Sequence, residues 1–272
     1  MLATNTDQSE TAKSQQVDDF RAANFQVVES LSRHTKILNN NHKEILNKLL
    51  PSIANKIEAE SPDTRYNALK IFTDYVTQFM CEEKIYQPQE NTQTTQKLNE
   101  LLLKKFLANY GMIVTDNDPM PLQGLKLLSV IVERNQAFVM ILRKLNLITV
   151  LFDYFAVGHL KFNTSTVKIV RAIVASREIE LEELLEMQIV SKINGIMADV
   201  VKDNSEWCSD HLLVIMNEIL HLAAELKKVN EESPTPQKVF DELLVNFKSF
   251  SKLLKASDVV SSWDCDGYDL FC

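Results

Sequence analysis

The chain has 272 residues, of which 45% are hydrophobic, and a formal net charge of −8. Its five glycines and seven prolines are few for a sheet-rich fold with many tight turns, and they argue against a glycine-rich phosphate loop. An acidic chain without a concentrated basic face also argues against nucleic-acid binding, which needs positive charge to neutralise phosphates. We therefore expect an all-α protein.

The cysteines and the apolar segments indicate the cellular compartment of the protein. Cys81, Cys208, Cys265 and Cys272 form no disulfide framework, which favours reduced thiols inside a cell. The N-terminus has neither the basic nor the apolar region of a secretory signal. No apolar run is long enough to span a bilayer. We therefore expect a cytoplasmic protein that does not insert into membranes.

Helical periodicity follows a polar N-terminal segment. Residues 1–16 are polar and have no period, which predicts a disordered tail. From Val17 onward, apolar residues recur at helical spacing. Further helices are expected at 42–60, with Pro51 opening a new helix inside this range, at 61–79, and at 97–111, where Gly111 ends the helix after a polar loop at 87–96.

A pattern of apolar residues then occurs twice at an offset of 42 residues. Leu127 corresponds to Ile169, and the same offset carries Leu151 onto Ile193 without a gap. A helical unit of this length is in the range of armadillo and HEAT repeats, and three helices per unit favour armadillo. The helices expected in the first copy lie at 121–134, 137–145 and 147–157.

This repeat explains why the helix at 121–134 is apolar around its whole circumference. A surface helix needs one apolar stripe, whereas a helix inside a stack contacts both its own repeat and the next. We predict an armadillo/HEAT-like α-solenoid over residues 17–257, with its last helices at 205–229 and 233–257. Residues 258–272 lack a helical stripe and are expected to form an extended acidic-aromatic tail.

The sequence shows no catalytic or metal-binding pattern. Cys208 and His211 share a helix face and His221 lies further along, but structural zinc takes four ligands at closer spacing. The segment DCDGYD (264–269) has glycine at its fourth position, whereas a calcium loop requires it at the sixth. There is no G-x-S-x-G motif. We expect a protein that is not an enzyme and has no cofactor or metal.

Some residues in and around the first repeat copy are particular choices. They are Asp118-Pro119-Met120-Pro121-Leu122, Leu125-Lys126-Leu127-Leu128, Glu133, Asn135, Phe138, Leu147-Ile148, Leu151-Phe152 and ELLEMQIVSKI (183–193). With these residues, the segment at about 118–200 resembles the C-terminal armadillo-like region of the Fused and Unc-51-like-four group of kinases and pseudokinases.

The resemblance implies a role in motile cilia, in the central apparatus of the axoneme or in Hedgehog-type signalling, with a kinesin-like protein as partner. It carries over no catalytic residue, because the chain has no glycine-rich loop and no V-A-I-K, H-R-D or D-F-G motif. The chain is then expected to pair with such a kinase or pseudokinase, or to be part of one. A location in the cilium or axoneme, associated with microtubules, follows from the resemblance alone.

The leading hypothesis is a scaffold whose stacked third helices line a groove for a segment of a protein partner. The candidate groove residues are Thr149, Asp153, Tyr154, Lys192 and Asn194. In the tail, Trp263, Tyr268 and Phe271 alternate with aspartates, and large rings often anchor interfaces. This tail is expected either to dock on a partner or to cap the end of the repeats.

Two other functions are compatible with such a fold. One is an adaptor in nuclear transport or vesicle traffic, which is disfavoured because Trp207 and Trp263 do not form a regular array along successive repeats. The other is a regulatory subunit of a cytosolic kinase or phosphatase, which the sequence does not separate from the scaffold.

Overall fold

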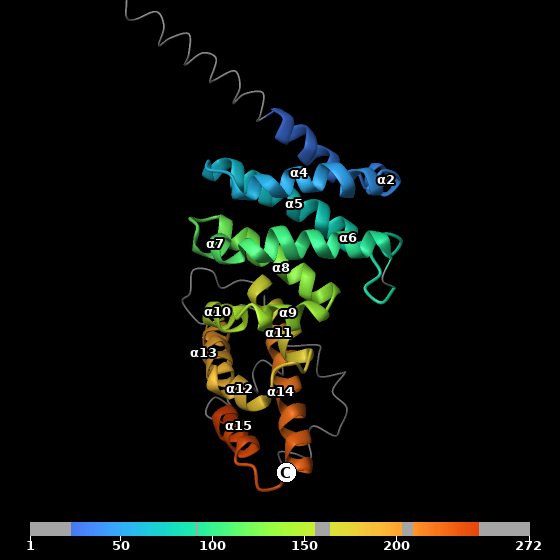
Figure 1. Cartoon of the computed structure of the whole chain (residues 1–272). Helices are drawn as coiled ribbons and strands as arrows, with labels where there is room; N and C mark the ends of the chain where they lie inside the picture. Colours follow the sequence, from blue (N-terminus) through green and yellow to red (C-terminus); the bar gives the residue numbers. More distant parts are fainter. Residues whose placement is uncertain (1–22, 91, 156–163, 203–208, 245–272) are drawn as a thin grey trace, which may run out of the picture. The chain divides into compact units, whose positions relative to one another are not determined.

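The computed structural model describes residues 23–90, 92–155, 164–202 and 209–244, and the regular structure in these ranges is helical (Figure 1). The all-α prediction is confirmed there. The tails predicted at 1–16 and 258–272 lie outside the described residues. The chain divides into two compact units, Met1–Val130 and Ile131–Cys272, and the division falls within α8 (Met120–Arg134).

The first unit contains two long helical runs that change their pitch along the way. After a helix at 23–32, the elements are α2 (Thr35–Asn40), α3 (His42–Glu44), the π-helix η1 (Ile45–Leu49), α4 (Leu50–Ala54), the 3₁₀-helix η2 (Asn55–Glu58), α5 (Pro62–Cys81), α6 (Gln93–Leu101), the π-helix η3 (Leu102–Phe106), the 3₁₀-helix η4 (Leu107–Asn109) and α7 (Tyr110–Thr115). Helix α5 packs against α4 and η2.

Prolines and caps set the helix starts in this unit. Pro51 is the second residue of α4 and follows the widened turn of η1, but the helical run is continuous from His42 to Glu58, so the prediction that a new helix opens at Pro51 is wrong. Because proline has no N–H, it leaves the carbonyl four residues earlier without its usual partner, which suits a change of pitch at that point. The hydroxyl of Ser61 caps α5 by accepting the Thr64 N–H at 3.4 Å, and that of Thr92 caps α6.

The prediction that Gly111 ends a helix is wrong, because Gly111 lies inside α7 and the run continues to Thr115. A glycine inside a helix costs about 1 kcal/mol. The next turn buries Ile113 completely and Val114 nearly so, and burying an aliphatic side chain contributes about 1.5–3 kcal/mol. Continuing the helix is therefore favourable.

The second unit repeats a three-helix pattern, as predicted. The elements that follow α8 are α9 (Ala137–Lys144), α10 (Leu147–Tyr154), α11 (Thr164–Ala175), α12 (Leu181–Glu186), α13 (Ile189–Lys202), α14 (Ser209–Val229) and α15 (Thr235–Leu244). Helix α14 contacts α11, α13 and α15.

The backbone preserves the offset that the apolar residues indicate. Asn146 and Gln188 precede α10 and α13, and both adopt a left-handed conformation, with φ of 55° and 58°. Their numbers differ by 42, so the turn between the second and third helices recurs in register with the apolar residues. Leu127 and Ile169, which this register pairs, are both fully buried.

Helices α7 and α8 approach each other closely at Gly124. A Cβ atom at this position would lie 2.6 Å from Cγ2 of Ile113, which is closer than real carbon contacts. Tyr110 lies nearby, and both neighbours are fully buried. The absence of a side chain at residue 124 therefore allows this spacing.

Candidate functional site

The structure brings part of the predicted groove together at α10 and α13. The Lys192 ammonium donates to the backbone carbonyl of Phe152 at 2.9 Å and lies 3.7 Å from Oδ1 of Asp153. A cation at this place complements the negative C-terminal end of α10. The third helices of the two repeat copies are thus joined by a lysine that sequence analysis selected.

Two of the predicted groove residues are buried. Tyr154 is 9% exposed and Asn194 is 6% exposed. The Asn194 amide donates to the backbone carbonyl of Glu242, so it joins α13 to α15, and burial raises the pKa of the Tyr154 hydroxyl. In this structure these two side chains belong to the packing between helices, whereas Thr149 and Asp153 are exposed. Whether any of them binds a partner stays a prediction.

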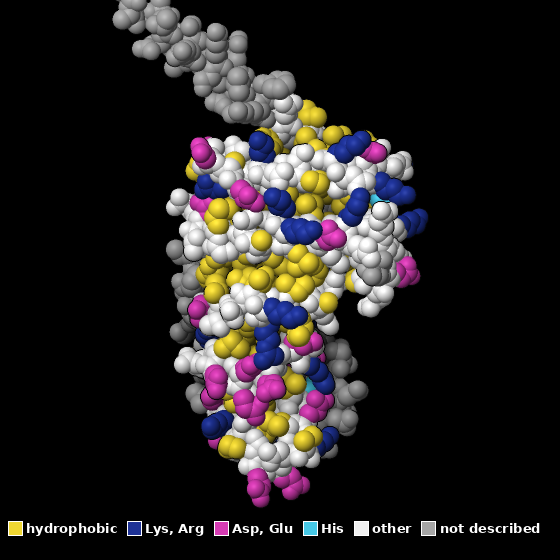
Figure 2. Space-filling model, in the orientation of Figure 1, with side chains coloured by type: hydrophobic (Ala, Val, Ile, Leu, Met, Phe, Trp, Pro, Cys, Tyr) yellow, Lys and Arg dark blue, Asp and Glu magenta, His cyan; other side chains and the backbone are white. Residues whose placement is uncertain are grey.

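Thr149 lines a small cavity between the turn that precedes α10 and the turn that precedes α13. Its volume is about 290 Å³, and two of its lining residues, Arg143 and Glu183, form an ion pair of 2.6 Å. Arg143 also donates to the backbone carbonyl of Glu178. Figure 2 shows acidic side chains gathered over the area that Figure 1 labels α12. The cavity lining is Arg143, Asn146, Ile148, Thr149, Ile179, Glu183, Glu186 and Met187.

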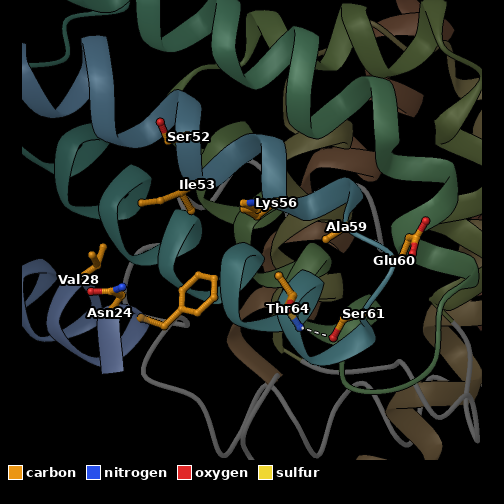
Figure 3. Close-up of a pocket in the computed structure, with 10 residues that line it drawn as sticks. Asn24, Val28, Ser52, Ile53, Lys56, Ala59, Glu60, Ser61 and Thr64 are labelled. Atoms are coloured by element: carbon orange, nitrogen blue, oxygen red, sulfur yellow. Dashed lines mark hydrogen bonds between the residues drawn. The ribbon is translucent and has the colours of Figure 1, made fainter. Parts of the chain in front are cut away.

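The first unit has a larger cavity, of about 560 Å³, which sequence analysis missed (Figure 3). The helix at 23–32 forms one side with Phe25 and Val28, and α4 contributes Ile53 to the other. The charged side chains of Lys56 and Glu60 lie at its border and are exposed. Periodicity indicated only that the apolar residues from Val17 onward lie on a helix, and it could not show that the space beside Phe25 and Val28 is open.

Several residues singled out in the sequence lie outside the described part of the chain. Trp263, Tyr268 and Phe271 lie outside it, as does Cys208 of the considered zinc set. His211 has its Nδ1 3.2 Å from Nη1 of Arg171. Within the described residues, no three His, Cys, Asp or Glu side chains are placed to hold a metal ion. No helix in those ranges is long and apolar enough to cross a membrane.

The fold therefore defines a class of helical-repeat proteins, and comparison with known families shows which family of this class the chain belongs to. A family model described as serine/threonine-protein kinase ULK4-like, HEAT repeats, matches residues 1–140, which is just over half of the chain. The chain belongs to this HEAT-repeat family. The matching family is described as HEAT repeats, whereas three helices per unit favour the armadillo type. The two assignments differ in whether a short middle helix, such as the 6-residue α12, is counted as a separate helix of the repeat.

Two curated relatives are serine/threonine-protein kinases. RUNKEL of Arabidopsis thaliana is 27% identical over 193 residues, which cover 70% of this chain and 14% of that protein. ULK4 of Mus musculus is 19% identical over 234 residues, which cover 81% of this chain and 18% of that protein. The chain thus spans less than a fifth of the length of these relatives. No solved structure matches it.

Proposed function

We propose that this HEAT-repeat chain is a non-catalytic scaffold that binds protein partners. The main supporting observation is the open cavity of the first unit. Its apolar residues lie beside the side chains of Asn24, Lys56 and Glu60, which make no hydrogen bond or ion pair with other described residues. Val27, on the same helix as Phe25, is 60% exposed. An exposed apolar area bordered by unpaired polar groups is typical of a protein interaction site.

The experiment compares variants of the cavity with a variant elsewhere. Val28→Asp places a charge in the apolar lining, and Lys56→Glu reverses a border charge on an exposed side chain. Val229→Asp is the control, because Val229 is 86% exposed and lies at the end of α14. We expect the first two variants to recover fewer partners in quantitative affinity purification while melting like the parent. If both recover the same partners as the parent, this cavity is not the binding site.

The cellular setting is a further part of the proposal. The resemblance to the Fused and Unc-51-like-four group supports a microtubule-associated complex in the cilium or axoneme, with a kinase or pseudokinase and a kinesin-like protein as partners. Proximity labelling in ciliated and unciliated cells tests this location. Labelling of the same non-ciliary proteins in both would contradict it and leave the scaffold function intact.

The names of the two relatives favour a second candidate. Both are serine/threonine-protein kinases, and the chain matches only 14% and 18% of their lengths, so the repeats could act as a regulatory or adaptor part of a kinase assembly. Phosphotransfer activity that co-purifies with the chain, and that is lost with Lys56→Glu, would favour this function over a purely structural scaffold.

The aromatic tail offers a separate test of partner binding. Deletion of 259–272 removes Trp263, Tyr268 and Phe271 together. If the tail docks on a partner, binding is lost while the melting temperature is unchanged. If the tail caps the repeats, the melting temperature falls and the affinity stays the same.

A further inference from the structure

A second groove in the first unit is lined by lysines. It has a volume of about 270 Å³ and lies between the helical run at 42–58 and the run that begins with α6. In the space-filling view, hydrophobic side chains are flanked by Lys and Arg over the rows that Figure 1 labels α4 and α6 (Figure 2). The lining residues are Leu46, Asn47, Pro51, Lys97, Glu100, Leu101, Lys104 and Lys105.

Hydrogen bonds connect the two walls of the groove at two separate places. Lys97 donates to the side-chain oxygen of Asn47. Nearer the C-terminal ends of the two runs, Glu58 accepts from the Asn109 amide at 2.9 Å and lies 3.6 Å from the Lys105 ammonium. These bridges connect the two walls, so the groove lies between side chains that interact across it.

Both walls contain a π-helical segment. Leu46 and Asn47 belong to η1, and Lys104 and Lys105 belong to η3. π-helices hold well under 1% of residues in globular proteins, and their wide turns occur frequently at functional sites. That two such segments line one groove favours a functional surface there, in addition to its charge.

The charge of the groove is opposite to that of the chain. Its lining includes three lysines and one glutamate, a net charge of +2, and it remains positive when Glu58, the partner of Lys105, is counted, whereas the whole chain has −8. Lys104 pairs with Glu100 at 3.2 Å, but the two side chains are 73% and 64% exposed. An ion pair so exposed contributes little, so a carboxylate from another molecule can replace Glu100 as the partner of Lys104.

We propose that this groove binds an acidic segment of a partner protein, with carboxylates at Lys97 and Lys104. An apolar side chain of the same segment would lie on Leu46 and Leu101. A peptide combines both properties, whereas nucleic acid would bring many phosphates close to a strongly acidic chain. This site is distinct from the cavity at Phe25 and Val28, so it can fail or stand without the proposed function.

The probe is a fluorescein-labelled synthetic peptide in which pairs of glutamates alternate with single leucines, and the measurement is fluorescence anisotropy with the full chain. The double variant Lys97→Glu/Lys104→Glu is expected to lower the affinity by about tenfold or more, since it replaces attraction with repulsion at two positions. Lys227→Glu/Lys228→Glu, which makes the same change of net charge at exposed residues in the last turn of α14, should bind like the parent.

A gain of affinity provides a second arm that does not depend on disrupting the surface. Glu100→Gln removes the internal competitor of the ligand and is expected to tighten binding of the same peptide several-fold. The proposal is overturned if the peptide does not bind the parent chain, or if neither set of variants changes its affinity. Binding of a thymidine oligonucleotide as tightly as the peptide would also overturn it, because the site would then be a general polyanion site.

Discussion

Arg65 and Asp116 form an ion pair that joins the first turn of α5 to the residue after α7. The Nε of Arg65 donates to Oδ2 of Asp116 at 2.9 Å, and Nη2 lies 2.7 Å from the same oxygen. Nη1 donates to the backbone carbonyls of Ala59 and Glu60 at 3.1 and 2.8 Å. The two side chains are 16% and 9% exposed, so this network is shielded from solvent.

Replacement of Arg65 with alanine should destabilise the chain by about 2–4 kcal/mol, because it leaves a buried carboxylate and two carbonyls without their donor. Urea denaturation measures the change. Arg33→Ala is the control, since Arg33 is 74% exposed in its pair with Glu29, and it should change stability by less than about 1 kcal/mol. Equal losses of unfolding free energy in the two variants would show that the buried Arg65 network stabilises the chain no more than the exposed pair of Arg33 and Glu29.

Asp116→Asn should weaken the chain at neutral pH and have little effect in acid. Burial alone would raise the pKa of Asp116, but the Asn117 backbone N–H and the Arg65 guanidinium together hold this pKa below its usual range. A lowered folded pKa contributes stability above the unfolded value, about 3.9, and this contribution is lost as the pH falls through the folded pKa. Chemical denaturation of parent and variant from pH 7 to pH 3 tests whether their difference shrinks.

Asp74→Asn should have the opposite effect, a gain of stability at neutral pH. Burial raises the pKa of Asp74, and Lys126 and Lys70 offset this only in part, while Glu29 adds to it. A raised folded pKa contributes stability below the unfolded value, about 3.9, and this is lost as the pH rises through the folded pKa. The amide should therefore stabilise the chain at pH 7, and the gain should vanish below about pH 4. A destabilised variant at pH 7 would contradict this reasoning.

Gln188→Gly should raise the melting temperature, because Gln188 has a φ of 58° that glycine adopts without strain. The expected gain is at most about 1 kcal/mol, since glycine also gains freedom in the unfolded chain. Gln188→Val should lose stability, because a β-branched residue is a genuine outlier at positive φ. Differential scanning calorimetry of both variants checks the order valine, glutamine, glycine.

A charge in the core of either repeat copy should unfold more than its own helix. Leu127→Asp and Ile169→Asp each place a carboxylate at a fully buried position, which costs several kcal/mol or forces protonation. Since neighbouring repeats share their interface, protection from hydrogen exchange should fall across several helices together. Leu145→Asp, at a 45% exposed residue, is the control.

The sequence predicted the repeat region closely, because apolar periodicity, prolines and turns agree there. The helices expected at 121–134 and 137–145 lie at Met120–Arg134 and Ala137–Lys144. The helix does not end at Gly111 as expected, because the low helix propensity of one glycine costs less free energy than burial of the side chains on the next turn contributes. The π-helical turns were missed, since a single extra residue in a turn leaves the apolar spacing almost unchanged.

The candidate site was predictable only in part. Asp153 and Lys192 were selected from their polarity and their position on the third helices, and they do lie together. Tyr154 and Asn194 were selected on the same basis, but both are buried. The amide of Asn194 is satisfied by a carbonyl 48 residues away, and such a distant partner cannot be read from local sequence.

The close approach of α7 and α8 at Gly124 couples the substitutions that residues 113 and 124 can accept. The Cβ of any side chain at residue 124 would lie 2.6 Å from the Cγ2 methyl of Ile113, and Ile113 is fully buried. A smaller residue at 113 removes this methyl but leaves a cavity in the core, which alanine at 124 can partly fill. Each change alone is thus expected to destabilise the chain, and the pair should cost less than the sum of the two, so the residues should change together in evolution.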